Sequence, residues 1–248
     1  MGFICYPDLK LKEIKKTIAI GKAKEIKTEI NFTTGLLNIK SSSNQLSEGI
    51  YKYSKDKWKP TITYSESQQF GNLKIFSFVE DANFNYSNSK SFDNADSCMW
   101  DISLNNKLKN DIAIKLIAGK GNIDLSNCEL KRFDCSMTAG EMNINLRNSS
   151  VPNFIFSAFA GKVVIDLSGN WKNDLNANIK GGVGEISLRL PSKKGIKLNV
   201  VGILGEVNIP KLNKQGNTYT NSLFGKTKES LYIDITGGIG NVNVQLVD

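Results

Sequence analysis

Two aspartates occupy equivalent positions in a repeated segment of the chain, and paired carboxylates are what glycoside hydrolases use. Asp124 and Asp166 lie two repeats apart, with Asn145 midway between them at intervals of 21 residues. If each repeat forms one layer of stacked strands, two layers separate the acids by about 9.6 Å, near the upper limit for inverting enzymes. A carbohydrate-active enzyme is therefore one hypothesis. The other is an outward polar ladder of Asp, Asn and Ser that keeps one face hydrated.

Other chemistry is largely excluded by composition. The chain has no histidine, so Ser-His-Asp and Cys-His nucleophile pairs and histidine metal sites cannot form. The segment AGKGNIDLS is similar to the calcium-binding nonapeptide, but Asp124 falls one place late, and a one-residue shift in a strand reverses the face. We therefore predict a non-enzymatic protein with no catalytic residues, no cofactor and no metal site.

The elements that would position these residues are copies of one short repeat. Corner glycines recur every 21 residues in AGKGNIDLS, AGEMNINLR, AGKVVIDLS and GGVGEISLRL, and later copies read GILGEVNIP and GGIGNVNVQL. Apolar and polar residues alternate on both sides of each corner, which is typical of half-buried strands. Glycine at a corner permits a positive φ or a close backbone approach. The predicted structural corners are Gly35, Gly119, Gly140, Gly161, Gly182, Gly202 and Gly238.

The constant spacing indicates an all-β fold. Two short strands per repeat, stacked in register, predict a β-solenoid or β-helix-like stack, and an antiparallel β-sandwich is the alternative. Within this fold Ile144 and Ile165 should face the core. We place an irregular, basic β region at residues 1–97, including a loop at 81–97, and a β-repeat domain at residues 98–248. Together they would form one continuous elongated unit.

Charge suggests possible partners. The net charge is +8, and residues 1–60 carry 12 Lys against 6 acidic residues. This basic end could attract an anionic envelope polymer or lipid, or its lysines could only protect strand edges from aggregation. The lysines are scattered without an aromatic platform, which argues against nucleic-acid binding. The sequence leaves the oligomeric state open.

The cysteines and the chain start bear on location. Cys128 and Cys135 flank one turn and could pair, or they and Cys98 could be buried free thiols. No segment is long enough to span a membrane, and no signal peptide precedes the repeats. Cys5 could be a lipidated cysteine, although Gly2-Phe3-Ile4 is a poor lipobox.

The stretch from Trp100 to Leu246 resembles the bacterial toastrack β-repeat proteins. That group includes lipoproteins with a toastrack N-terminal domain, and the C-terminal region of accessory membrane proteins in the cell-wall-antibiotic response. The resemblance rests on the Trp100-Asp101-Ile102 strand, the Ala-Gly corners, Gly169-Asn170-Trp171-Lys172, Lys180-Gly181-Gly182-Val183-Gly184 and Gly216-Asn217-Thr218-Tyr219, and it extends to Lys57-Trp58-Lys59-Pro60.

The resemblance implies a solenoid-like fold and an extracytoplasmic position at the cell envelope. It also implies binding, adhesion or stress sensing rather than catalysis, with a protein or an anionic envelope polymer or lipid as the partner. A regulatory domain that restrains a membrane histidine kinase is a further alternative beside the carbohydrate-active enzyme.

Overall fold

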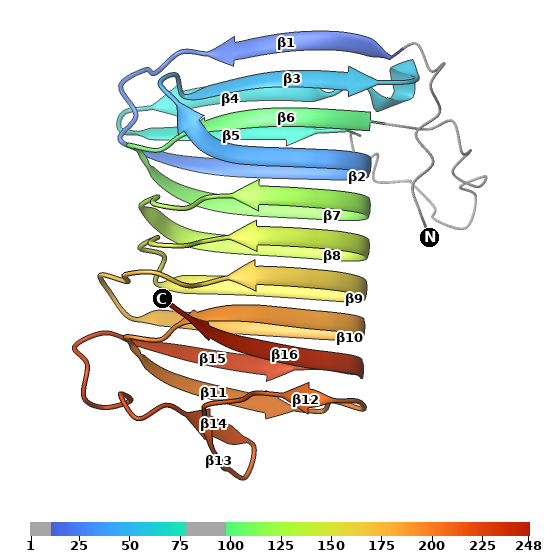
Figure 1. The fold of residues 1–248 in the computed structure, drawn as a ribbon. Coiled ribbons are helices and arrows are strands. Elements are labelled where there is room, and N and C mark those ends of the chain that lie inside the picture. The colour runs from blue at the N-terminus through green and yellow to red at the C-terminus, as the bar shows by residue number, and fades with distance from the viewer. Residues whose placement is uncertain (1–10, 78–97) are drawn as a thin grey trace.

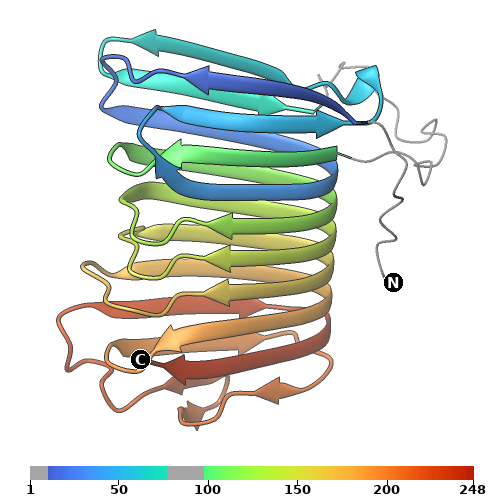
Figure 2. The same ribbon diagram turned by 45° about the horizontal axis from the view of Figure 1, so that its top comes forward.

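The chain folds into one long stack of β-strands. The computed structural model describes residues 11–77 and 98–248, and within these ranges it has sixteen strands and one short 3-10 helix, η1 (Asp56–Trp58). The strands lie side by side along the stack (Figures 1 and 2). The predicted all-β, solenoid-like architecture is therefore confirmed.

Five long strands form the middle of the stack, and each is bent so that it gives one arm to each of two facing layers. They pair in parallel, and their U-shaped bends line up along the right-hand edge of Figure 1. The sequence predicts two short strands per repeat. In the structure they are the two arms of one bent strand, because backbone pairing with the neighbouring strands continues on both sides of the bend. The long strands are β2 (Glu25–Ser43), β7 (Lys109–Asp124), β8 (Leu130–Asn145), β9 (Asn153–Asp166) and β10 (Leu175–Pro191).

Shorter strands complete the N-terminal end. β5 (Phe70–Phe76) and β6 (Cys98–Asn105) continue the two arms of β2 in parallel. Antiparallel strands then follow: β4 (Thr61–Ser67) on β5, β3 (Ser47–Tyr53) on β6, and β1 (Lys12–Ile18) on β3. Strands from both sides of the expected 97/98 boundary share one sheet. The loop expected at 81–97 lies outside the described residues.

The C-terminal end does not follow chain order. β15 (Ser230–Thr236) and β16 (Ile239–Val247) pair with the two arms of β10. β11 (Gly195–Val201) and β12 (Val207–Asn208) come earlier in the chain but lie one layer further out, against β15 and β16. A hairpin of β13 (Asn213–Gln215) and β14 (Thr218–Thr220) covers β11. The repeat copy at Gly237 therefore stacks between the copies at Gly181 and Gly202, which sequence order did not predict.

The core fills the space between the two arms. Alternate side chains of each strand point inward and stack on those of the next coil, as Phe133 does on Phe154 with ring centroids 5.4 Å apart. Near the N-terminal end, Trp100 contacts Phe32 and Tyr51 edge to face. Ile144 and Ile165, expected to face inward, are buried and adjacent in register.

A column of glycines lines the bends. Gly119, Gly140 and Gly161 have φ of 130–133°, which side chains rarely adopt. The backbones of successive bends are so close that a Cβ on Gly140 would lie 1.9 Å from the carbonyl oxygen of Gly119. Only glycine fits this approach. The glycine column consists of Gly35, Gly119, Gly140, Gly161, Gly184, Gly240 and Gly205.

The predicted corners Gly182 and Gly238 lie at the bends, two residues before the column glycines, and neighbouring backbone leaves no room for a Cβ at either one. The register expected after Gly161 is nevertheless wrong by two residues there and by three at Gly202. Gly161 pairs with Gly184, a spacing of 23 residues rather than 21. The extra residues lie in the loop after β9, which wraps buried Trp171; its Nε1 donates to the Leu167 carbonyl at 2.6 Å.

Replacing a column glycine should destabilise the stack far more than replacing a loop glycine. Gly140→Ala should lower the free energy of unfolding by at least about 3 kcal/mol, because the Cβ meets backbone and φ is strained. Gly216→Ala is the control, since φ is +60° there but no heavy atom lies within 4 Å of the added Cβ; it should cost about 1 kcal/mol. Equal urea midpoints for the two variants would contradict the close approach.

Burial should separate two isoleucines on the same strand. Ile165 is fully buried and Ile155 is 39% exposed on the outer face of β9. Ile165→Ala should cost about 2–5 kcal/mol through lost burial and a cavity, whereas Ile155→Ala should cost under about 1 kcal/mol. Chemical denaturation of both variants measures the difference, and similar losses would mean that the inward register is wrong.

Candidate binding surfaces

The two aspartates singled out from the sequence lie in a shallow groove on the outer face of the second arms. Asp124 ends β7, Asp166 ends β9, and Asn145 lies between them in register. Arg189 follows in the next strand, with Nη1 3.9 Å from Oδ2 of Asp166. The structure thus places both acids in one groove, two coils apart, as the repeat predicts.

Hydrogen bonds show what these side chains do locally. Oδ1 of Asp124 accepts the Ser126 N–H at 3.0 Å, and Oδ1 of Asp166 accepts the Ser168 N–H at 2.9 Å. Asn145 makes the same bond to the N–H two residues on, at 3.0 Å. A short Asx side chain that accepts from residue i+2 forms a turn. This position therefore closes the turn after each arm, whether it carries Asp or Asn.

A neighbouring row of amides forms a continuous hydrogen-bonded ladder across four strands. Nδ2 of Asn143 donates to Oδ1 of Asn122 at 3.0 Å, Asn122 donates to Asn38 at 2.9 Å, and Asn38 donates to Asp101 at 2.8 Å. The row ends at Val164, the register partner of Asn143. Each side chain is engaged by the next coil, so the row stabilises the stacking of the layers.

The described part of the chain has neither a cluster of metal-ligating side chains nor a reactive thiol. Across residues 11–77 and 98–248 no group of three or more Cys, Asp or Glu side chains is placed to hold a metal ion. Cys128 and Cys135 are buried free thiols that do not pair with each other, and Cys98 is also buried. Burial raises the pKa of Cys128 and of Cys135, which keeps both protonated and weakly nucleophilic. Cys5 lies outside the described residues.

Three lysines of the described part of the basic N-terminal end lie close to carboxylates. Nζ of Lys12 lies 2.7 Å from the Asp56 carboxylate, and Lys15 and Lys52 lie 3.4 and 3.7 Å from Glu13. These pairs are exposed and contribute little stability. They do reduce the local positive charge on edge strand β1, where charged residues discourage pairing with another chain.

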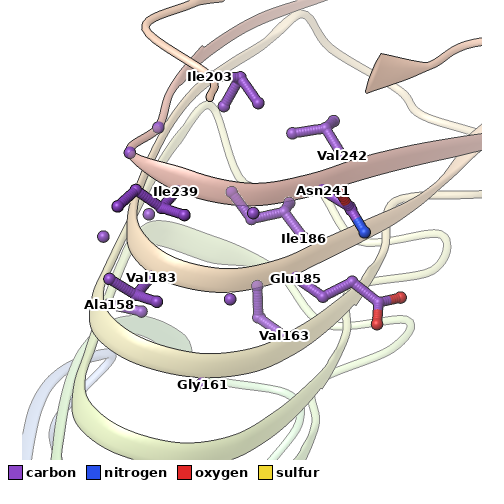
Figure 3. Close-up of a pocket in the computed structure, with 16 residues that line it drawn as sticks. Ala158, Gly161, Val163, Val183, Glu185, Ile186, Ile203, Ile239, Asn241 and Val242 are labelled. Carbon is purple, nitrogen blue, oxygen red and sulfur yellow. The ribbon is translucent and has the colours of Figure 1, made fainter. Parts of the chain in front are cut away.

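The most conspicuous surface is apolar and follows the bends of four successive coils. It carries Phe159 on β9, Val183 on β10, Ile239 on β16 and Leu204 just before β12, which are 74%, 53%, 60% and 71% exposed. Register pairs Val183 with Ile239 and Ile239 with Leu204. Figure 3 shows Val183 and Ile239 one above the other on successive bends, pointing away from the core. We call these four residues the corner ridge.

Charges of alternating sign run beside the bends. Lys120 pairs with Glu141 at 3.4 Å, and Lys162 pairs with Glu185 at 3.2 Å. A hydrogen bond from Ser187 and the nearby Lys162 ammonium lower the pKa of the Glu185 carboxyl, so this group stays ionised at neutral pH. The corner ridge is therefore apolar in the middle and charged along its border.

Sequence reasoning missed the corner ridge. A signal was present: the position before the column glycine is Ala118, Ala139 and Ala160 in three coils but Val183 and Ile239 in the next two. The shifted register after Gly161 hid this change from alanine to larger residues.

Bent parallel strands stacked on a glycine column define an all-β rack. The chain belongs to the family described as the N-terminal domain of toast_rack, DUF2154, whose model matches residues 8–161. The resemblance to toastrack proteins is thereby confirmed. The match also reaches well into the N-terminal half, beyond the stretch from Trp100 on which the resemblance mainly rested.

Three solved structures that match the chain have adhesion-related or lipid-related names. A provisionally assigned cell adhesion protein from Clostridium sporogenes ATCC 15579 is 30% identical with a TM-score of 0.70, over 96% of this chain and 100% of that chain. A provisionally assigned adhesin from Bacteroides fragilis NCTC 9343 is 12% identical, with a TM-score of 0.31 over 95% of this chain and 98% of that chain. A provisionally assigned lipid binding protein from Parabacteroides distasonis ATCC 8503 also has 12% identity and a TM-score of 0.31, over 97% and 96% of the two chains.

The last two similarities are too weak to support any argument about fold or function. No curated protein matches the chain. No helix in the described ranges is long and apolar enough to cross a membrane.

The turn role of the two aspartates can be separated from a catalytic one. Asp124→Asn combined with Asp166→Asn should change the free energy of unfolding by under about 0.5 kcal/mol, because Asn accepts the same N–H, as Asn145 does. The corresponding double alanine variant loses both turn bonds and should cost about 1–2 kcal/mol. Urea denaturation measures both. Polysaccharide hydrolysis that disappears in the double Asn variant would reinstate the enzyme hypothesis.

Proposed function

We propose that this chain is a non-enzymatic binding module of the cell envelope that adheres to a protein partner through the corner ridge. The single observation that carries the proposal is the exposure of four large apolar side chains on four successive coils. Monomeric surfaces scatter such residues singly, whereas contiguous apolar patches with a polar border are typical of protein interaction sites.

The energetics favour a protein partner over a charged polymer. Fully burying a Val, Leu, Ile or Phe side chain stabilises a complex by roughly 1.5–3 kcal/mol each, before the costs of association. The flank that follows the bends is close to neutral, because Lys162 faces Glu185 and Lys120 faces Glu141. Such a flank gives an anionic polymer or lipid little net attraction.

The adhesive role and the envelope location draw on the similar protein from Clostridium sporogenes. It is 30% identical over its full length and is provisionally assigned to cell adhesion. The same fold at that identity supports, for this chain, the same broad role. The carbohydrate-active alternative has no comparable observation in its favour, since Asp124 and Asp166 are engaged in turns.

Removing the corner ridge should weaken adhesion without unfolding the rack. Labelled full-length protein carrying Phe159→Ser and Leu204→Ser should bind whole cells of the producing bacterium about tenfold more weakly than the unaltered protein. Flow cytometry measures the bound fraction. Ile155→Ser is the matched control, because Ile155 is exposed on the same strand but lies outside the ridge.

Two further arms distinguish the partners. Protease treatment of the cells should abolish binding if the partner is a protein. Co-sedimentation with anionic vesicles and purified wall polymer, at low and high salt, should detect no salt-sensitive binding. Unchanged binding by the ridge variant, or binding to wall polymer alone, would refute the proposal.

A further inference from the structure

We propose that the partner of the corner ridge is a second copy of this chain, packed ridge to ridge about a two-fold axis parallel to the stack. This inference rests on the proposed function, since it names the occupant of the same surface. Two observations carry it: large and small side chains alternate across the ridge, and opposite charges lie on its two flanks.

Each bend of the ridge presents two consecutive positions, and at the bends of β9, β10 and β16 one is large and the other small. On β9 the large residue Phe159 precedes the small residue Ala160. The order is reversed at the next two bends: Gly182 precedes Val183 on β10, and Gly238, just before β16, precedes Ile239. The strand register sets these pairs one above the other. At each of these levels the ridge therefore carries a large side chain beside a residue with a small side chain or none.

A two-fold axis parallel to the stack brings each bend opposite the same bend of the second copy and exchanges the two positions. Phe159 then faces Ala160 of the second copy, and Val183 faces Gly182 of the second copy. Every large side chain meets a small one, which permits close packing. A two-fold axis perpendicular to the stack would instead place Gly182 of one copy opposite Gly238 of the other. A void would remain between the two glycines, and the dispersion contacts across the interface would be lost there.

Charges on the two flanks agree with the same axis. On β10, Lys180 precedes the Gly-Gly bend and Glu185 follows it, so that they lie on opposite sides of the ridge. The axis brings Lys180 of each copy toward the Lys162–Glu185 pair of the other, in which Glu185 is the group of opposite charge. Glu185 is ionised, because Ser187 and Lys162 stabilise its carboxylate. The two symmetric attractions would favour this orientation over random contact of apolar surfaces.

The size of the ridge predicts the strength of the dimer. Four levels at a strand spacing of about 4.8 Å make a ridge only roughly 14 Å long. A contact made by four side chains over this length buries less area than the roughly 800 Å² per partner of a standard interface. The bends of β8 and β7 continue the same straight edge, with Ala139 and Ala118 at the register position that Val183 and Ile239 hold further along. We therefore expect a weak, reversible dimer.

Self-association of the full chain is the direct test. Sedimentation velocity from about 1 to 500 µM should reveal a monomer–dimer equilibrium. Phe159→Asp with Val183→Asp should raise the dissociation constant about tenfold or more. Ile155→Asp, on the same strand but outside the ridge, should leave it unchanged. Circular dichroism and thermal melting of each variant verify that the rack is intact.

A swap of two neighbours tests the packing itself. Ala160→Phe alone should block the dimer, because it sets phenylalanine opposite Phe159 of the second copy. Adding Phe159→Ala moves the large side chain to the other position, and the axis again sets large against small, so the dimer should return. If Phe159 and Ala160 only stabilised the fold of the single chain, the double variant would not be expected to recover the dimer.

Orientation has its own readout. In a protein that carries Ala139→Cys and Cys5→Ser, a short bismaleimide cross-linker should join the two introduced thiols of a dimer. A two-fold axis parallel to the stack places the β8 bends of the two copies at the same height, within reach of the linker. In the perpendicular arrangement these bends lie at opposite ends of the contact and should not react. Absence of this cross-link in a dimeric sample would overturn the proposed axis.

The outcomes separate this inference from the proposed function. A protein that stays monomeric throughout, yet loses cell binding with Phe159→Ser and Leu204→Ser, overturns the second copy and leaves the ridge as an adhesive surface. A dimer that survives Phe159→Asp with Val183→Asp also overturns the inference. If ridge substitutions alter neither self-association nor cell binding, both proposals fail.

Discussion

The whole rack depends on how closely the backbones of successive bends approach one another. Each glycine of the column lies where its neighbour's carbonyl oxygen leaves no room for a Cβ, as between Gly161 and Gly140. This contact fixes the height and direction of every bend, so the two arms of each strand stay in register over the length of the stack. The core between the arms, the amide ladder on the outer face and the line of the corner ridge all follow from that alignment.

Much of this architecture could be predicted from the sequence because it is local. The alternation around Met142 and Ile144 and the recurrence of Gly119, Gly140 and Gly161 report strand, bend and period directly. The register beyond Gly161 could not be predicted, since the two extra residues in the Trp171 loop leave the local pattern intact. Nor could the position of β15 and β16 between earlier strands, because long-range pairing leaves no mark in local alternation.

The surfaces illustrate the same limit for function. The type and spacing of Asp124 and Asp166 predict a pair of carboxylates, and the structure places both in one groove. Each side chain nevertheless accepts a turn hydrogen bond, as Asn145 does. The sequence does not mark Phe159 as a surface residue, because large apolar residues are usually core residues. Its exposure depends on the bend, where consecutive side chains no longer alternate between the inside and the outside. A surface of this kind becomes visible only when the register is known.

The out-of-order C-terminal layers alter how this protein can fold. A typical repeat array adds one unit at a time, and each new unit docks on a finished neighbour. Here β11 and β12 have no neighbour toward the centre of the stack until β15 and β16 have been inserted between them and β10. The last layers must therefore form together, as a single cooperative block closed by the hairpin of β13 and β14. Shortening the rack by one repeat from this end would remove that block as a unit, whereas a regular solenoid would lose only its final coil.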